Sequence, residues 1–379
     1  MKKIYSIMAS VVLMSAFTAC SNDDDMPKVA NVNGSELVVK SVGVASIDTK
    51  AGITANNFTN GESLGLYIYR GDGINGTSIA PGDETYNDGT GSEFESTVNV
   101  PYNEAAGSWS ATSQAIILSN VKGKVYAYYP YKENNNAAES GVDNGLAVKV
   151  SVATSQGTGQ SDGKKDQDQT DYMWADPVSD VSNANSSVDL RMNHALSMIT
   201  FKFVQTTEDG IKYPGEGMVS KIVLQNQTGG HVVKTGDATM NIATGKLDLG
   251  SANDGTITLT PNAGESLMGQ GAAAKLPRLL VYPTEANITG TDAAVAVTVD
   301  DYTYTVKIPS LLIDDPEDTE APINKIGSPW LPGKNYVYTL TMKGTGLSIT
   351  SVTIVPWEDV EGNSGASMEV VDPDPAPIP

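Results

Sequence analysis

Short runs of alternating apolar and polar residues dominate this sequence, and this pattern constrains the fold more than any other feature. Ile199, Phe201 and Phe203, for example, alternate with Thr200 and Lys202. Similar strand-like runs fall at 64–69, 115–118, 125–131 and 336–342. No stretch has a convincing amphipathic helical period, so the sequence predicts an all-β chain of stacked antiparallel sheets with few short helices.

Two pairs of runs are close enough in sequence to form hairpins. The residues of 295–299 are predicted to pair with 302–308 across Asp300-Asp301, and those of 240–242 with 247–249. Each pair is linked by residue types that favour tight turns.

Two strand-like segments depart from strict alternation. Leu37–Ile47 is rich in β-branched residues, but its alternation is imperfect and its register is therefore uncertain. After Leu347 and Ile349 the apolar positions shift phase, which predicts a bulge near Ser351.

Charge and residue counts exclude several classes of function. The net charge is −21, so the 379-residue chain should repel nucleic acid and anionic lipid. It has one cysteine, which permits no internal disulfide, and two histidines, which nearly exclude histidine-dependent hydrolases and His-rich zinc sites. No cofactor-binding motif is recognisable. These counts favour a protein without cofactor or catalytic activity.

The N-terminus has the pattern of an export signal. Two lysines precede an apolar stretch, residues 4–17, that is too short to span a membrane. Small residues then lead to Cys20, the only cysteine in the chain. This pattern resembles a bacterial lipoprotein signal, which implies that residues 1–19 are the signal peptide and Cys20 the lipidated residue; a plain secretory signal with an incidental cysteine is the alternative. The acidic run at 21–25 is interpreted as part of a flexible tether.

A polar Ser/Asn run at 183–187 separates two strand-rich halves and is the predicted domain boundary. The predicted organisation is a tether with an N-terminal strand at 20–50, a first sandwich at 51–185 and a second at 186–379. The length of the chain suits about two domains of ordinary size.

Two acidic clusters could bind a metal ion or act in catalysis. Spaced aspartates such as those at 166, 168 and 171 can bind calcium, but the segment lacks the glycine and terminal glutamate of an EF-hand, so a solvated loop is the preferred interpretation. A second cluster could supply paired glycosidase carboxylates but more simply forms an exposed loop; it comprises Asp314, Asp315, Glu317, Asp318 and Glu320.

His194 and four tyrosines could each have either a functional or a structural role. His194 lacks a catalytic partner that the sequence can identify, so a structural, hydrogen-bonded role is preferred. The tyrosines of one predicted strand could stack on a sugar, but such residues more often pack a sandwich core; they are Tyr126, Tyr128, Tyr129 and Tyr131.

Several segments, in order along the chain, resemble the fimbrillin family, the type V pilins of Bacteroidetes. The lipoprotein signal and acidic tether are similar to the surface-export signal of lipoproteins from that group. The other matching segments are Thr49–Gly52, Phe58–Tyr69, Val125–Tyr131, Asp171–Ala175, His194–Phe201, Pro332–Tyr338 and Pro356-Trp357. Together they cover most of the chain that would follow the signal.

The resemblance implies two tandem transthyretin-like β-sandwiches and assembly by donor-strand exchange. In this mechanism a trypsin-like protease removes an N-terminal strand, and a strand of another subunit fills the vacated groove. Lys50 and Ala51 are the expected cleavage site here, although the family commonly has arginine in place of Lys50.

The donor strand is expected near the C-terminus, with Ala366, Met368 and Val370 as its residues. Alternating prolines from Pro373 onward cannot lie in a central ladder. The tail after Val371 is therefore expected to form a polyproline-like surface or the end of an edge strand.

The expected function is that of a pilus subunit in cell adhesion, at the outer membrane and cell surface and, after processing, in fimbriae. Its partners would be other copies or paralogous subunits, the maturation protease and the outer membrane, through the lipid on Cys20. A monomeric glycan-binding lipoprotein is the alternative, and a glycosidase is the third possibility.

Overall fold

The computed structural model describes the chain in segments that form strands and turns but no helix. These segments are residues 35–44, 58, 60–70, 99–112, 115–118, 122–133, 147–157, 170–206, 212–261, 276–314, 325–344, 346–357 and 366–369. The all-β prediction is confirmed, whereas the few short helices expected from sequence do not occur in these residues. Nor does any described helix have the length and apolarity needed to span a bilayer.

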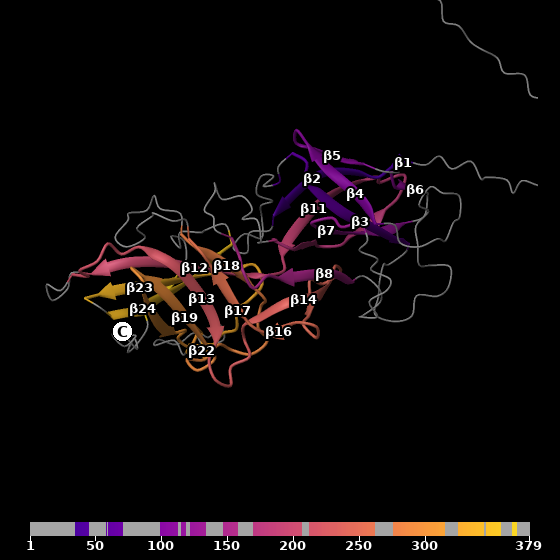
Figure 1. The fold of residues 1–379 in the computed structure, drawn as a ribbon. Helices are drawn as coiled ribbons and strands as arrows, with labels where there is room; N and C mark the ends of the chain where they lie inside the picture. Colours follow the sequence, from indigo (N-terminus) through magenta and orange to yellow (C-terminus); the bar gives the residue numbers. More distant parts are fainter. Residues whose placement is uncertain are drawn as a thin grey trace, which may run out of the picture. The chain divides into compact units, whose positions relative to one another are not determined.

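The N-terminal part forms a twisted mixed sheet (Figure 1). Its order is β2 (Val38–Val44), β11 (Ser187–His194), β9 (Met173–Ala175), β7 (Gly123–Tyr129), β3 (Ser63–Arg70), β4 (Val100–Ala105) and β5 (Ser108–Ala111), with β10 (Val178–Val181) beside β7. A separate two-stranded sheet is formed by β1 (Ser35–Glu36) and β6 (Ile117–Leu118). Only the β2–β11 pairing in this sheet is parallel.

Buried side chains of β2–β7 and β9–β11 form what we call the first core. Alternation places Leu64, Leu66 and Ile68 of β3 in this core. The strand follows a turn at Asn60-Gly61, in which Gly61 has a φ of 92°, a backbone angle that glycine adopts at little cost.

The C-terminal part contains three larger strand groups and one ribbon. The first is β18 (Arg278–Val281), β12 (Ser197–Thr206), β23 (Lys334–Lys343), β24 (Gly346–Pro356) and β25 (Ala366–Glu369). The second is β17 (Thr256–Leu259), β13 (Val219–Asn226), β19 (Ala293–Val299) and β20 (Tyr302–Lys307). The third joins β14 (Lys234–Asn241) to β15 (Leu247–Asp248), β16 (Asn253–Asp254) and β8 (Ala147–Val152), and the ribbon is β21 (Leu312–Asp314) with β22 (Lys325–Gly327).

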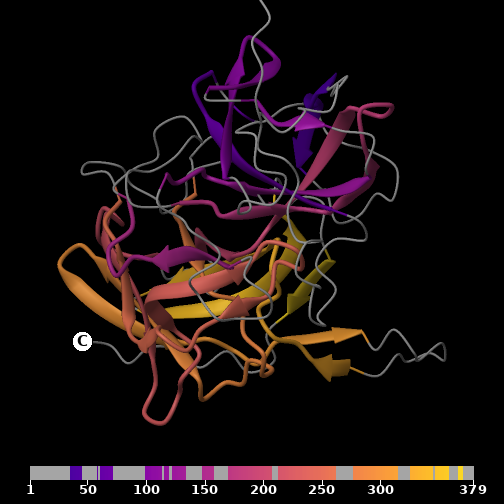
Figure 2. The ribbon, with the colours of Figure 1, turned by 90° about the vertical axis from the view of Figure 1, so that its right-hand side faces the viewer.

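The long strands β12, β23 and β24 run side by side in both views (Figures 1 and 2). Their inward side chains belong to the second core, the buried cluster built mainly from β8, β12–β14, β17–β20, β23 and β24. Tyr336, Tyr338, Leu340 and Met342 all face it, as their alternation predicts. The register shifts between Thr339 and Leu340, which pair with Ser351 and Ile349, so the predicted bulge is confirmed.

Both predicted hairpins are confirmed. Strand β19 pairs with β20 so that Val299 lies opposite Tyr302, and Met240 of β14 lies opposite Leu247 of β15. Asp300 and Asp301 have φ angles of 46° and 71°, both left-handed, as a two-residue type I′ turn requires.

The two cores divide the chain differently from the predicted domains. Strand β11, which begins at Ser187, contributes to the first core, while β8 pairs with β14 and contributes to the second. Met192 of β11 is the last residue of the first core, whereas the second core takes most of its residues from Ala195 onward. Four earlier tyrosines also belong to the second core, namely Tyr67, Tyr126, Tyr128 and Tyr172. A boundary near residue 185 therefore remains a prediction about domain organisation and does not coincide with this change of core.

Candidate functional site at the N-terminal strand

The N-terminal strand is bonded to the β6 segment at its start and to β11 along the rest of its length. The N–H of Leu37 donates to the carbonyl oxygen of Ile116 at 2.8 Å, and β2 continues parallel to β11. The Tyr102 hydroxyl donates to the carbonyl oxygen of Leu37 at 3.1 Å. Residues 35–44 cover parts of β6, β11 and the first core. We call this covered surface the strand seat.

The side chains that enter the strand seat follow an interrupted alternation. Leu37, Val39, Val42 and Val44 are buried, with exposures of 1–3%. Val188 pairs with Val39 but Asp189 pairs with Ser41, so the exposed Lys40 is an extra residue in the ladder. This bulge explains the imperfect alternation of the sequence, because it restores the apolar phase after Lys40.

The contribution of these four side chains is large relative to the stability of a domain. Each buried leucine or valine side chain contributes about 1.5–3 kcal/mol, so the four together contribute roughly 6–12 kcal/mol. Whole domains are stable by only about 5–15 kcal/mol. An empty strand seat would also leave main-chain groups of β11 unpaired. The first sheet therefore needs a strand in this position.

The C-terminal segment lies at the edge of the second part of the chain. Strand β25 pairs antiparallel with β24, with Ala366 opposite Ile354 and Met368 opposite Val352. The predicted donor segment is thus bonded to its own chain at these residues. Val370 lies outside the described residues, as do Cys20, Lys50 and Ala51.

His194 has the structural role that the sequence favours. Its Nδ1 lies 3.0 Å from Oδ1 of Asp171, and its ring stacks on Trp357 with centroids 4.2 Å apart. The side chain is 4% exposed, and no nucleophile is among these partners. Asp171, the one described residue of the proposed calcium trio, is used in this contact.

The tyrosines of β7 are core residues. Tyr126, Tyr128 and Tyr129 are between 1% and 4% exposed. Tyr129 packs edge-on against Phe58, and Tyr128 donates to Asn99 Oδ1 at 3.1 Å. None of the three rings can stack on a sugar from solution, so the core interpretation is confirmed for them.

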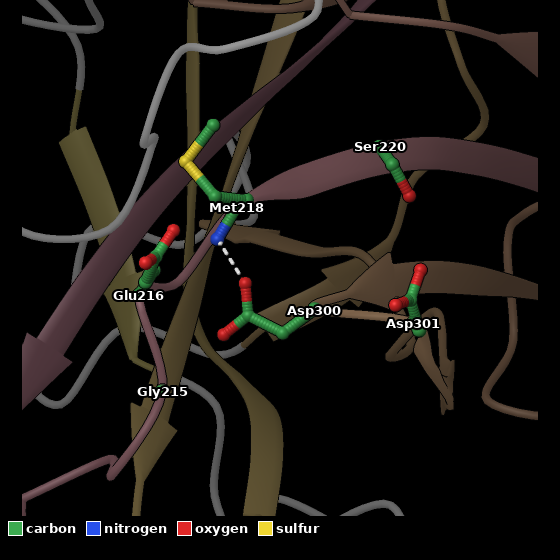
Figure 3. Close-up of a pocket in the computed structure, with 6 residues that line it drawn as sticks. All are labelled: Gly215, Glu216, Met218, Ser220, Asp300 and Asp301. Carbon is green, nitrogen blue, oxygen red and sulfur yellow. Dashed lines mark hydrogen bonds between the residues drawn. The ribbon is translucent and has the colours of Figure 1, made fainter.

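A surface cavity of about 420 Å³ lies beside the β19–β20 turn (Figure 3). Three carboxylates line it, those of Glu216, Asp300 and Asp301. The Asp300 carboxylate is already engaged, because it accepts hydrogen bonds from the N–H groups of Gly217 and Met218 at 2.9 and 2.8 Å. No group of three or more His, Cys, Asp or Glu side chains in the described segments is placed to hold a metal ion.

The Asp300 carboxylate should make the folding stability of the chain sensitive to acid. Partial burial favours its neutral form, but hydrogen bonds from Gly217, Met218 and Tyr213 outweigh burial and lower its pKa from the usual range of an aspartate. Its folded-state pKa is lower than in the unfolded chain, so its contribution to stability is present above about pH 4 and is lost as pH falls through the lowered pKa. Asp300→Asn should therefore show a smaller loss of stability below pH 4 than wild type in urea unfolding.

Asp301→Asn is the matched control, since it changes the neighbouring turn residue and leaves the hydrogen bonds of Asp300 in place. An identical acid response in wild type and the Asp300 variant would contradict this assignment.

Sequence reasoning missed the partners of the N-terminal strand. It identified Leu37–Ile47 as strand-like, but not β11 as its neighbour or Tyr102 as the residue bonded to it. The irregular alternation around Lys40 was the available signal, and it indicates a bulge without indicating the strand opposite.

Comparisons with solved structures identify proteins with a similar fold. A crystal structure of a candidate cell adhesion protein from Bacteroides uniformis superposes with a TM-score of 0.52 at 18% identity, covering 86% of this chain and 99% of that one. A second, from Bacteroides ovatus, has a TM-score of 0.52 at 15% identity and covers 85% and 98%. Among curated protein sequences no significant match was found.

At these identities the two structures establish a shared fold. The family model described as fimbrillin-like matches residues 49–357, which is most of the chain. This protein therefore belongs to the fimbrillin-like family.

Proposed function

We propose that this chain is a structural, non-catalytic subunit of a cell-surface fimbria, assembled by protease-triggered strand exchange. Membership of the fimbrillin-like family supports a pilus-related role in adhesion at the cell surface. The observation that carries the proposal is the N-terminal strand, which supplies four buried side chains to the first core.

The strand can act as a placeholder because the chain after it contains Lys50, the proposed cleavage residue. Cutting there would separate β2 from the rest of the sequence while leaving its ladder to β11 in place. A non-covalent strand can then be displaced by a strand from another subunit, which restores the ladder and refills the apolar trough. Such head-to-tail contacts do not close, and they therefore build filaments.

Before cleavage, we propose that a lipid on Cys20 holds the subunit at the outer membrane. Acyl chains contribute about 0.8 kcal/mol per buried CH₂ group, so more than one chain gives stable anchoring. Cleavage at Lys50 removes this anchor together with residues 20–50. Release from the membrane and opening of the strand seat would then be consequences of one event.

The experiment is treatment of purified precursor with a trypsin-like protease. We expect cleavage after Lys50 and ladders of polymer that resist SDS without heating. Lys50→Gln should remain uncut at this position and monomeric, and Lys50→Arg should behave like wild type. Cleaved wild-type chain that remains monomeric would contradict the proposal.

A further inference from the structure

We propose that the cavity beside the β19–β20 turn binds a neutral sugar unit. Its volume of about 420 Å³ is within the usual range of small-molecule sites, about 300–1,000 Å³. It lies between the segment that leads into β13 and the turn after β19 (Figure 3). The inference goes beyond a structural role in the filament, because it gives each subunit a ligand. It rests on the proposed function only for the display of many such sites together.

Hydrogen bonds within the chain hold the Asp300 side of the cavity in place. The Asp300 carboxylate accepts from the main-chain N–H groups of Gly217 and Met218 at 2.9 and 2.8 Å. It also accepts from the hydroxyl of Tyr213, which is in turn hydrogen-bonded to Tyr304 of β20. This side of the cavity is therefore formed before any ligand arrives, and such preorganisation lowers the cost of binding.

The charge of the cavity does not favour a cation as the ligand. Two of its three carboxylates are engaged, since Asp300 accepts the hydrogen bonds above and Glu216 is not free either. Asp301, the third, is exposed. A single exposed carboxylate attracts a cation only weakly in water. It is a good acceptor for hydroxyl groups, because hydrogen bonds to a charged group are stronger than those between neutral groups.

Two elements supply polar groups for a sugar. Ser220 lies on β13 and Asp301 in the β19–β20 turn, and their oxygen atoms point toward one another in Figure 3. A carboxylate accepts hydrogen bonds, whereas a hydroxyl both donates and accepts them, so the pair can bind neighbouring hydroxyl groups of one sugar ring. The half-buried Met218 adds an apolar contact for the C–H groups of the ring.

Tyr302 provides an aromatic surface next to these polar groups. It directly follows Asp301 and is 56% exposed, more than any other large apolar side chain among the described residues. Tyr302 and Tyr304 are two positions apart in β20 and therefore point to the same face, on which Tyr304 contacts Tyr213. A sugar ring has C–H groups on its face and hydroxyl groups at its edge, which suits an amphipathic aromatic ring flanked by polar side chains.

The charge of the protein disfavours acidic sugars. The net charge is −21, and no basic residue is among the described residues that line the cavity. A sialic or uronic acid would bring a further carboxylate into this negative field and would be repelled. The site should therefore select neutral sugars.

Repetition of the site along a filament would strengthen a weak interaction. A single sugar unit in a surface cavity has few atoms to contribute, so we expect a dissociation constant on the order of 1 mM. Linked sites that bind at the same time raise the apparent affinity by about 10²–10⁴. A filament with one site in each subunit would then hold a glycan-coated surface that a single subunit holds only briefly.

Saturation-transfer NMR on the uncleaved full chain tests the site. The neutral probes are D-glucose, D-galactose, D-mannose and N-acetyl-D-glucosamine, and N-acetylneuraminic acid is the acidic probe. We expect binding of at least one neutral sugar and none of the acidic one. Tyr302→Ala should weaken binding about threefold to tenfold, whereas Tyr302→Phe should retain it. Leu312→Ala, which alters another exposed apolar side chain, is the matched control and should bind as wild type does.

Failure of all four neutral sugars to bind, or equal binding by wild type and Tyr302→Ala, would overturn the site. Binding of N-acetylneuraminic acid as tightly as a neutral sugar would overturn its selectivity. Because Tyr302 is exposed, these variants should have the unfolding midpoint of wild type, and a lower midpoint would overturn the assignment of Tyr302 as a surface contact.

The display of many sites is tested on a surface coated with the neutral sugar that binds. Cleaved polymer should bind it at least about a hundredfold more tightly than uncleaved precursor, and equal affinities would contradict the display. Binding by the precursor does not require assembly. Loss of sugar binding therefore leaves strand exchange intact, and absence of polymer after cleavage contradicts only the proposed function.

Discussion

Val42→Asp should destabilise the first sheet by about 3–5 kcal/mol, because it places a carboxylate in a buried apolar position without a partner. Val42 is 3% exposed and pairs with Leu190, another member of the first core. The measurement is urea unfolding of the uncleaved precursor, followed by tryptophan fluorescence; Trp109 reports on the first core.

Val38→Asp is the control for this variant, because it lies on the same strand but on the exposed face. Its effect should remain within about 0.5 kcal/mol, as is usual at the surface. Equal effects of the two substitutions would mean that β2 contributes little to the core, and the placeholder role would lose its energetic basis.

Trp330→Ala should destabilise the second core by about 3–5 kcal/mol, as large-to-small replacements of buried aromatic residues do. Trp330 and Tyr338 are fully buried, and the Trp330 Nε1–H donates to the Tyr338 hydroxyl at 3.1 Å. The main-chain N–H of Trp330 also donates to Oγ1 of Thr284 at 2.9 Å. The measurement is the unfolding free energy in guanidinium chloride.

Two variants near Trp330 separate volume from hydrogen bonding. Tyr338→Phe retains the ring but leaves the indole N–H buried and unpaired, which should cost about 1–3 kcal/mol. Leu331→Ala changes a side chain that is 40% exposed and should cost little. A loss for Leu331→Ala as large as that for Trp330→Ala would contradict the assignment of Trp330 to the second core.

Local features of the fold could be predicted from sequence because their signals are local. The β19–β20 hairpin follows from alternating residues on either side of Asp300-Asp301, whose type favours a two-residue turn. The bulge in β24 follows from the phase shift near Ser351. In each case the partner strand is adjacent in sequence, so the alternation of apolar residues predicts both the strand and its partner.

Long-range pairings could not be predicted in the same way. The pairing of Val42 with Leu190 and that of Val150 with Ala238 join strands far apart in sequence, and an alternating pattern specifies a buried face without specifying a neighbour. The contact between Asp171 and His194 likewise depends on the pairing of β9 with β11. The sequence therefore predicted the N-terminal strand, whereas the strand seat that this strand occupies is identified only from the structure.

The central claim is that residues 35–44 hold a place that a second copy later takes. Hydrogen exchange of β11, before and after cleavage at Lys50, tests it most directly. We expect protection of β11 to fall on cleavage and return in the polymer, from which residues 35–44 are absent. A cleaved protein that retains residues 35–44 and keeps β11 protected throughout would contradict the claim.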